Sequence, residues 1–374
     1  MREATLGDIC EFKYGKSLPA KNRIEGAFPV FGSNGQVGSH VKAITRAPTI
    51  VVGRKGSVGE LHYSDSPCWP IDTTYYVDPS TSKADLRWLY HAMKMLRLTE
   101  LNKAAAVPGL NRNDAYQQKI LLPDIEDQRR IAAILDKADG IRSKRDEGLA
   151  LAEDFLKSAY AHTIGHLNPS HDDWAPYRVE QLAEECKGAI RSGPFGSALR
   201  HGEFVDEGIA VLGIDNAVQN KFMWAERRFI TPAKYEELRR YKVFPNDVII
   251  TIMGTTGRSA VVPNDIPEAI TTKHLATITC NPKIIHPEVL SFAIHSDPLI
   301  IRQIKSYNKG AIMDGLNLGI IRKLEFKLPP VEQQDKFVSV LRKVRSIERS
   351  ANTADCSGAY LFQSLCQRAF RGEL

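Results

Sequence analysis

Two glycine-rich segments hold the residues best suited to chemistry, and that chemistry is the binding of phosphate groups. The segments are GRKGSVG (53–59) and GTTGR (254–258). Their candidate ligands are Arg54, Lys55, Thr255, Thr256 and Arg258. Glycine lets a backbone come close to a phosphate, whose oxygens accept hydrogen bonds from cations and hydroxyl groups. Either segment could equally be a tight turn with solvated cations, and the pattern leaves both interpretations open.

Further cations and amides stand near glycines and aromatic residues elsewhere in the chain. They are Lys13, Lys16, Asn111, Arg191, Lys273, Lys309 and Asn317. Asparagine can pair with adenine and arginine or lysine with guanine in the major groove. We therefore predict that these loops bind DNA, without assigning which side chains reach a base.

Catalytic motifs are missing from the sequence, and we predict no catalytic residue. The string GKS (15–17) lacks the earlier glycine of a phosphate-binding loop, because Cys10 stands there. The nearest strings to an adenine-methyltransferase tetrapeptide are NPSH (168–171) and NPKI (281–284), and neither fits. The six cysteines form no C-x-x-C pair, so we expect reduced thiols and no metal site.

Composition indicates a globular protein with an anionic partner. The 374 residues are 43% hydrophobic and 25% charged, with a net charge of +6. Residues 1–123 hold 16 Lys and Arg against 11 Asp and Glu, whereas residues 167–328 hold 20 against 19. A basic balance favours nucleic acid. No apolar run is long enough to cross a membrane and no secretory signal opens the chain, so we expect a cytoplasmic protein without membrane contact.

The sequence contains one unit twice. LPDIEDQRRIAAIL (122–135) aligns without a gap with LPPVEQQDKFVSVL (328–341), and Gly-Leu-Asn precedes both, at 109–111 and at 315–317. Weaker similarities lie further upstream at shorter offsets, which indicates insertions within the body of the unit. We predict two variable domains (1–123 and 167–328), each followed by a less variable spacer helix (124–166 and 329–374).

Each spacer helix carries a narrow apolar stripe, which must be covered by a partner. The residues predicted to pair the helices or bind a partner are Gln128, Ile131, Leu135, Ala138, Leu149, Leu156, Gln334, Phe337, Leu341, Val344, Leu361 and Leu365. About 40 residues make a rod of roughly 60 Å. We expect an antiparallel coiled coil with the domains at opposite ends, related by a pseudo-twofold axis. Gly148 and Gly358 disfavour helix and suggest a bend or a third partner. Plain intramolecular packing without an outside partner is the alternative.

The domain bodies alternate strand and helix signals, which predicts an α+β fold. Buried strands are expected in 47–60 and 246–262, each leading into a glycine-rich loop. Helices are expected at 80–96, with Ser82 and Asp85 as an S-x-x-D capping box, at 231–241, with Thr231 as cap, and at 286–307.

This layout resembles the specificity subunit of type I restriction-modification systems. The resemblance rests on the paired LP-x-x-E-x-Q openings, the Gly-Leu-Asn strings, the glycine loops and the opening LGDICEFKYGKS (6–17). It spans essentially the whole chain, although Asp124 replaces the second proline of the usual opening.

The resemblance implies a non-catalytic subunit whose two domains each read one half of an asymmetric, bipartite site in double-stranded DNA. The helices would set the spacing of the halves and dock two methyltransferase subunits, which restriction subunits join. S-adenosylmethionine and ATP would belong to those partners, and no cofactor is expected in this chain. The rival interpretations are a DNA-modifying enzyme with its own catalytic domain and a protein-binding scaffold with a coiled-coil spacer.

Overall fold

The computed structural model describes residues 2–101, 109–224, 227–307 and 315–371, with their side chains except at 197, 352–367 and 369–371. The chain divides into two compact units. The first comprises residues 1–147 with 351–374, and the second comprises residues 148–350. Each long helix therefore contributes one part to each unit.

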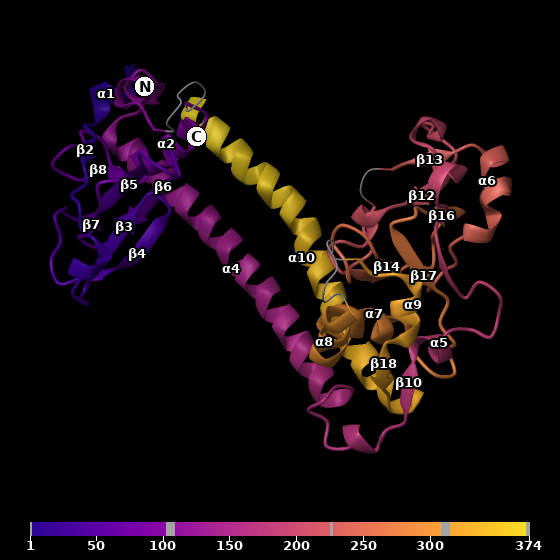
Figure 1. The fold of residues 1–374 in the computed structure, drawn as a ribbon. Coiled ribbons are helices and arrows are strands. Elements are labelled where there is room, and N and C mark those ends of the chain that lie inside the picture. The colour runs from indigo at the N-terminus through magenta and orange to yellow at the C-terminus, as the bar shows by residue number, and fades with distance from the viewer. Residues whose placement is uncertain (1, 102–108, 225–226, 308–314, 372–374) are drawn as a thin grey trace. The chain divides into compact units, whose positions relative to one another are not determined.

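The first domain is built from three small sheets and short helices (Figure 1). Its strands are β1 (Arg2–Thr5), β2 (Lys13–Tyr14), β3 (Phe28–Gly32), β4 (Gly35–His40), β5 (Thr49–Gly53), β6 (Leu61–Ser64), β7 (Trp69–Pro70), β8 (Thr74–Val77) and β9 (Lys119–Leu122). Its helices are α1 (Leu6–Ile9), α2 (Leu86–Met95) and α3 (Arg112–Tyr116), with 3-10 turns at Ala20–Asn22 and Leu98–Leu101. The sheet orders are β2-β8-β5-β6, β4-β3-β7 and β1-β9.

Helix α2 covers the central sheet of this domain. Every residue of β5 is buried, and the strand shares a core with Trp88, Leu89 and Met93 of α2. The predicted capping box is wrong for Ser82. Asp85 caps α2 by accepting hydrogen bonds from Arg87 N and Trp88 N. The Ser82 hydroxyl instead bonds to the backbone of Ala84.

The second domain has the same kinds of elements. Its strands are β10 (Pro176–Arg178), β11 (Ile190–Ser192), β12 (Ile209–Leu212), β13 (Phe229–Ile230), β14 (Val248–Thr251), β15 (Ser259–Val261), β16 (Ala269–Thr271), β17 (Leu275–Ile278) and β18 (Glu325–Lys327). Its helices are α5 (Val179–Leu182), α6 (Pro232–Leu238), α7 (Pro287–Ser296), α8 (Pro298–Tyr307) and α9 (Leu318–Lys323). Short 3-10 turns lie at His171–Asp173, Gly196–Ala198, His201–Glu203, Ile214–Asn216 and Arg239–Tyr241.

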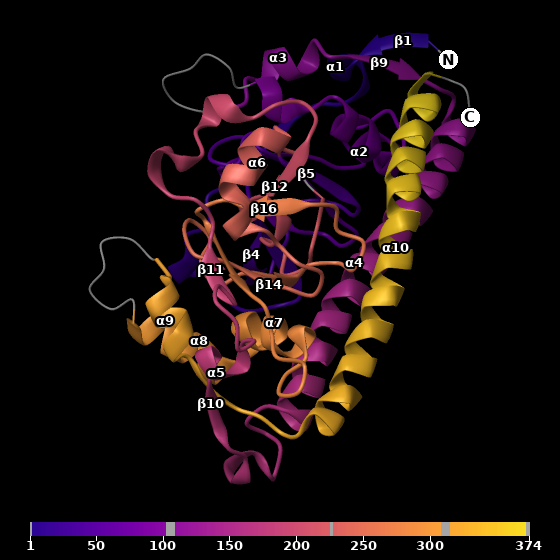
Figure 2. The same ribbon diagram turned by 90° about the vertical axis from the view of Figure 1, so that its right-hand side faces the viewer.

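Two helix predictions for the second domain have different outcomes. Helix α6 is confirmed with Thr231 as its cap, and it packs on β12 and β16 (Figure 2). The single helix expected at 286–307 is wrong. Pro298 cannot continue a helix, and the chain breaks into α7 and α8 at Asp297, whose carboxylate accepts a hydrogen bond from Leu299 N.

The internal repeat is confirmed strand by strand. The sheet orders of the second domain are β11-β17-β14-β15, β13-β12-β16 and β10-β18, which match those of the first domain in sequence. In both domains the three-stranded sheet contains one parallel pair, β3 with β7 and β12 with β16. The predicted α+β class and the duplication therefore both hold.

The two spacer helices are α4 (Ile125–Thr163, 39 residues) and α10 (Val331–Arg371, 41 residues). Both are assigned as helix through the glycines expected to interrupt them, Gly148 and Gly358. An added Cβ at Gly148 would meet nothing within 4 Å, so this glycine faces open space. The helical hydrogen bonds of long flanking segments outweigh the low propensity of single glycines.

Within the second unit, α4 and α10 pack antiparallel (Figure 1). The rings of Tyr160 and Phe337 lie 5.4 Å apart, centroid to centroid, and Glu153 Oε2 lies 2.9 Å from Arg345 Nη1. As the α4 number falls from 160 to 153, its partner in α10 rises from 337 to 345, which fixes the direction. Leu156, also buried here, shares this core, so the predicted antiparallel pairing holds in this unit.

The rest of the predicted stripe behaves differently. Ile131 and Leu135 are fully buried in the core of the first domain, which corrects the expectation that the other helix covers them. Ala138, Leu149 and Val344 are half-buried. The side chains of Leu361 and Leu365 lie outside the described residues.

Candidate nucleic-acid interface

Each domain forms a glycine-rich hairpin after a fully buried strand, β5 or β14. In the first, Gly53 N donates to Glu60 O and Gly59 N to Gly53 O, both at 2.8 Å. In the second, Thr251 N donates to Arg258 O at 2.8 Å and Gly257 N to Thr251 O at 2.9 Å. Gly56, Gly59, Gly254 and Gly257 all have positive φ between 74° and 81°. These glycines are required by the turn itself, because other residues avoid that conformation.

The Gly-Leu-Asn strings join each hairpin to the following helix. Leu110 N donates to Arg54 O at 2.9 Å, and Leu316 N donates to Ile252 O at 3.0 Å. The side chains of Asn111 and Asn317 cap α3 and α9. Both are exposed, but capping occupies their carboxamide oxygens, so these motifs have a scaffold role and any base contact by them stays a prediction.

Three of the four predicted cations of the first domain, Lys16, Arg54 and Lys55, have their backbone against residues 70–73. Lys16 N donates to Pro70 O, while Arg54 N and Lys55 N both donate to Thr73 O. Lys13 lies in β2, which pairs with β8, and its Nζ donates to the Ser80 hydroxyl at 3.4 Å.

Two residues that the sequence prediction missed complete this surface. These residues are Tyr14 and Arg112. The guanidinium groups of Arg112 and Arg54 both lie within cation–π range of the Tyr14 ring. Arg112 stands 98 positions after Tyr14 in the chain, so no local spacing could have joined them.

Arg191 is a correction, because its side chain is buried inside the second domain. Its guanidinium forms an ion pair with Asp247 and donates to the carbonyl oxygens of Lys242 and Gly188 and to the Thr279 hydroxyl. The residue is 9% exposed. A guanidinium with all these partners has no donor left for DNA, so the predicted DNA contact is wrong.

The remaining candidates of the second domain stay near its hairpin. Thr255 and Arg258 are exposed and Thr256 is half-buried. Ile252 N donates to His274 O at 2.9 Å, which brings the exposed Lys273 beside the loop. Burial lowers the pKa of His274, and the charges of Lys273 and Arg228 lower it further. Lys309 lies outside the described residues.

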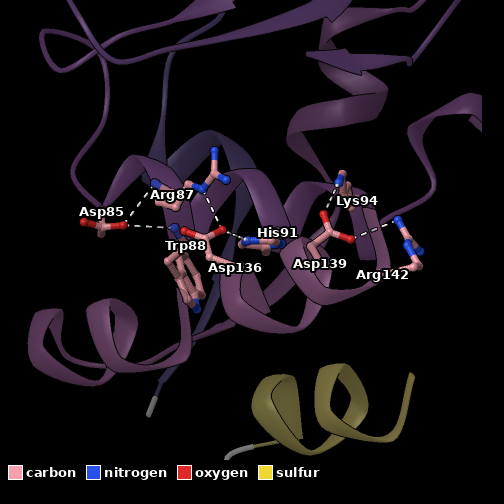
Figure 3. Close-up of polar contacts among 8 residues, drawn as sticks. All are labelled: Asp85, Arg87, Trp88, His91, Lys94, Asp136, Asp139 and Arg142. Carbon is pink, nitrogen blue, oxygen red and sulfur yellow. Dashed lines mark hydrogen bonds and ion pairs between the residues drawn. The ribbon is translucent and has the colours of Figure 1, made fainter. Parts of the chain in front are cut away.

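In the first unit, the domain is fastened to α4 by polar contacts from α2 (Figure 3). Arg87 Nε and His91 Nε2 each lie 2.7 Å from Asp136 Oδ1, and Lys94 Nζ lies 3.4 Å from Asp139 Oδ2. Burial lowers the pKa of His91 despite the opposing effect of Asp136, so the imidazole is neutral at physiological pH and donates to the carboxylate. These contacts and the buried Ile131 and Leu135 make the domain and its part of α4 one body.

Gln128 and Gln334 fasten each helix to its own domain, which corrects their predicted role in helix pairing. The buried Gln128 accepts from Asp85 N at 2.8 Å and donates to Pro123 O at 2.9 Å. The buried Gln334 accepts from His286 N at 3.1 Å and donates to Ile284 O and Pro329 O. The glutamine of the LP-x-x-E-x-Q opening thus bonds the backbone at the start of α2 or α7.

Replacing Gln334 with leucine should lower the free energy of unfolding by about 1–3 kcal/mol, because three backbone groups lose their partner away from water. The neighbouring Gln333 is exposed, so Gln333→Leu is a matched control expected to stay within about 0.5 kcal/mol. Urea unfolding of the full chain measures both. Equal effects of the two substitutions would show that the buried bonds of Gln334 contribute nothing.

Other classes of site find little support among the described residues. Across those ranges, no group of three or more His, Cys, Asp or Glu side chains is placed to hold a metal ion. Cys10, Cys68, Cys186 and Cys280 are free thiols, and burial raises the pKa of Cys10 to about 12, which disfavours a nucleophilic thiolate. Within the same ranges, no helix has the length and apolarity needed to span a bilayer.

Comparison with known proteins places this architecture among DNA-recognising subunits. The profile of the family described as "Type I restriction modification DNA specificity domain" matches residues 1–149 and 208–353. The specificity subunit of the type I restriction enzyme EcoBI of Escherichia coli is 23% identical over 349 residues, covering 87% of this chain and 73% of that protein. The EcoprrI specificity subunit of the same organism is 27% identical over 152 residues, covering 39% of this chain and 38% of that protein.

Solved structures share the fold. The crystal structure of a type I restriction-modification S subunit from M. genitalium superposes with a TM-score of 0.67 at 17% identity, over 99% of this chain and 96% of that one. A chain from a study of complex assembly and conformational transition in a type I system gives a TM-score of 0.52 at 16% identity, over 100% of this chain and 98% of that one.

Proposed function

The chain belongs to the type I restriction-modification DNA specificity family and is a DNA-recognition component of such a system, and we propose that each of its two domains reads one half of a bipartite, asymmetric site. The two halves would differ because the two domains differ in the residues that they expose. Catalysis would belong to other subunits, together with S-adenosylmethionine and ATP. The complex would act on double-stranded DNA in the cytoplasm.

The observation that carries this proposal is one scaffold that holds two unlike sets of loop residues. The backbone bonds of the hairpins and of the Gly-Leu-Asn strings repeat between the domains, as described above. The side chains do not: Arg54 occupies the position that Ile252 occupies in the second domain. A shared scaffold with divergent exposed residues suits the recognition of two different sequences with one docking geometry.

The spacer helices would dock the methyltransferase subunits, two per chain, to which restriction subunits add. Support comes from exposed apolar side chains on the helix pair of the second unit: Leu151 is 63% exposed, Phe155 55% and Ile347 69%. The Glu153–Arg345 pair brings Leu151 and Ile347 to the same level of the two helices. Large apolar side chains gathered on an exposed helix face favour a protein partner.

Lengthening both helices by one turn should change the spacer of the DNA site and leave its halves intact. Four residues inserted after Gly148 in α4 and four after Ser350 in α10 would lie opposite each other in the antiparallel pair. They lengthen each helix by about 6 Å. DNA rises about 3.4 Å per base pair, so the preferred spacer should grow by about two base pairs.

Sequencing of modified bases in cells that express the chain with its methyltransferase partner measures the spacer. The Gly148→Ala variant is the control, since its Cβ meets nothing and the spacer should stay the same. An insertion variant that keeps the original spacer and both halves would refute the spacing role of the helices.

A further inference from the structure

Tyr14 is an exposed aromatic side chain held between arginines in the first domain. The residue is 53% exposed, and its ring meets that of Tyr75 edge to face, with centroids 5.0 Å apart. The guanidinium carbons of Arg54 and Arg112 lie 5.4 and 5.5 Å from its centroid, within cation–π range. Tyr14, Arg54 and Arg112, called here the Tyr14 cluster, come from distant parts of the chain and meet on one surface.

The two guanidinium groups are held in place without being neutralised. Arg54 Nη2 donates to Asp72 O at 2.6 Å, and Arg112 Nη1 reaches Phe12 O at 3.5 Å. In the ranges that the structure covers, neither arginine has a carboxylate within ion-pair distance. A carbonyl leaves the positive charge intact, and the tyrosine ring lies beside both guanidinium groups. Arg54 Nε is buried, so Nη1 and Nη2 supply the donors that this side chain can offer to a ligand. Arginines arranged in this way suit phosphate oxygens and base edges.

The second domain lacks these residues at the equivalent positions. Strand register makes Ser192 the equivalent of Tyr14. Tyr14 lies opposite Tyr75 of β8, which lies opposite Val52 of β5. In the same way, Ser192 lies opposite Ala276 of β17, which lies opposite Ile250 of β14. Arg54 corresponds to Ile252, because each carbonyl oxygen accepts a hydrogen bond from the leucine of a Gly-Leu-Asn string. Arg112 corresponds to Leu318, because each directly follows the asparagine that caps its helix. Lys13 corresponds to Arg191, whose charge is already paired with Asp247.

We propose that the Tyr14 cluster is a DNA contact of the first domain alone, in which both arginines donate to DNA oxygens and the tyrosine ring supports them. It follows that the first domain supplies the larger part of the salt-dependent affinity. The charge balance agrees: residues 1–123 hold five more basic than acidic residues, whereas residues 167–328 hold one more. This inference rests on the DNA-recognition function proposed above.

The test is the salt dependence of DNA binding by the full chain assembled with its methyltransferase partner. Each lost phosphate contact lowers the slope of log affinity against log salt by about 0.9. We expect Arg112→Gln to lower the slope by about 0.9 and Arg54→Gln with Arg112→Gln by about 1.8. Lys283→Gln removes an exposed charge of the second domain and should leave the slope unchanged. Tyr14→Leu should weaken binding although no charge is removed.

These measurements distinguish failure of the Tyr14 cluster as a DNA contact from failure of the proposed DNA-recognition function. An unchanged slope in the folded double variant would overturn the proposal, and the Arg112→Gln variant alone decides it if Arg54→Gln impairs folding. Loss of assembly with the methyltransferase, with DNA binding retained by the free chain, would identify a protein-docking surface and also overturn it. Failure of the unaltered complex to prefer any DNA sequence would instead refute the proposed function.

Discussion

Replacing Phe337 with alanine should lower the free energy of unfolding of the second unit by about 3–5 kcal/mol. Phe337 is fully buried where α10 meets α4 and α7. Its ring lies 5.4 Å from that of Tyr160 and 5.1 Å from that of Phe292, centroid to centroid. Truncation removes contacts with both partners and leaves a cavity in a closely packed core. Urea unfolding of the full chain, followed by tryptophan fluorescence and circular dichroism, gives the value.

Ile347 offers the matched control ten residues further along the same helix. It is 69% exposed, so Ile347→Ala should change stability by less than about 0.5 kcal/mol. Because the apolar face that contains Ile347 is proposed to bind a partner, the same variant should still weaken assembly with the methyltransferase. A Phe337→Ala variant as stable as Ile347→Ala would contradict the packing of α10 against α4.

Replacing Arg191 with methionine should destabilise the second domain by about 3–5 kcal/mol and leave the salt dependence of DNA binding unchanged. The cause is Asp247, which is fully buried and would keep its charge without its cationic partner. Thermal unfolding and DNA titration over a series of salt concentrations measure the two quantities. A lower salt slope in folded protein would restore Arg191 as a DNA contact.

Neutralising Asp247 as well should recover much of this loss. Asp247→Asn removes the unpaired charge, and its one amide oxygen can still accept from Phe244 N. Its amide nitrogen can donate to the Thr279 hydroxyl, which donates to the carboxylate in the unaltered chain. The variant that combines Arg191→Met with Asp247→Asn should therefore be more stable than Arg191→Met alone. Additive losses in this double-mutant cycle would show that the ion pair has no coupling energy.

The sequence predicted the duplicated layout because its signals are local. The glycine hairpins and the asparagine caps recur in both copies, and each depends on backbone geometry within a few residues. The break between α7 and α8 was also a local signal, Asp297-Pro298, which the prediction of one long helix overlooked.

Tertiary contacts explain what the sequence could not reveal. Gln128 lies at a helical spacing from Ile131 and Leu135 and was therefore predicted to pair the helices. Its actual partner is Asp85 N in its own domain, 43 positions away, and no local pattern indicates that bond. Arg191 and Lys13 each stand two positions before a glycine. Only Arg191 contacts a buried carboxylate, that of Asp247, which lies 56 positions away. The Tyr14 cluster joins three segments and has no counterpart in the second copy, so the repeat could not reveal it.

Sequencing of modified bases in cells that express this chain with its methyltransferase partner shows whether its two domains read the two halves of one DNA site. We expect one asymmetric motif of two defined parts separated by a spacer of fixed length and unspecified sequence. A continuous motif without a spacer, or the same modification pattern in cells that lack this chain, would contradict it.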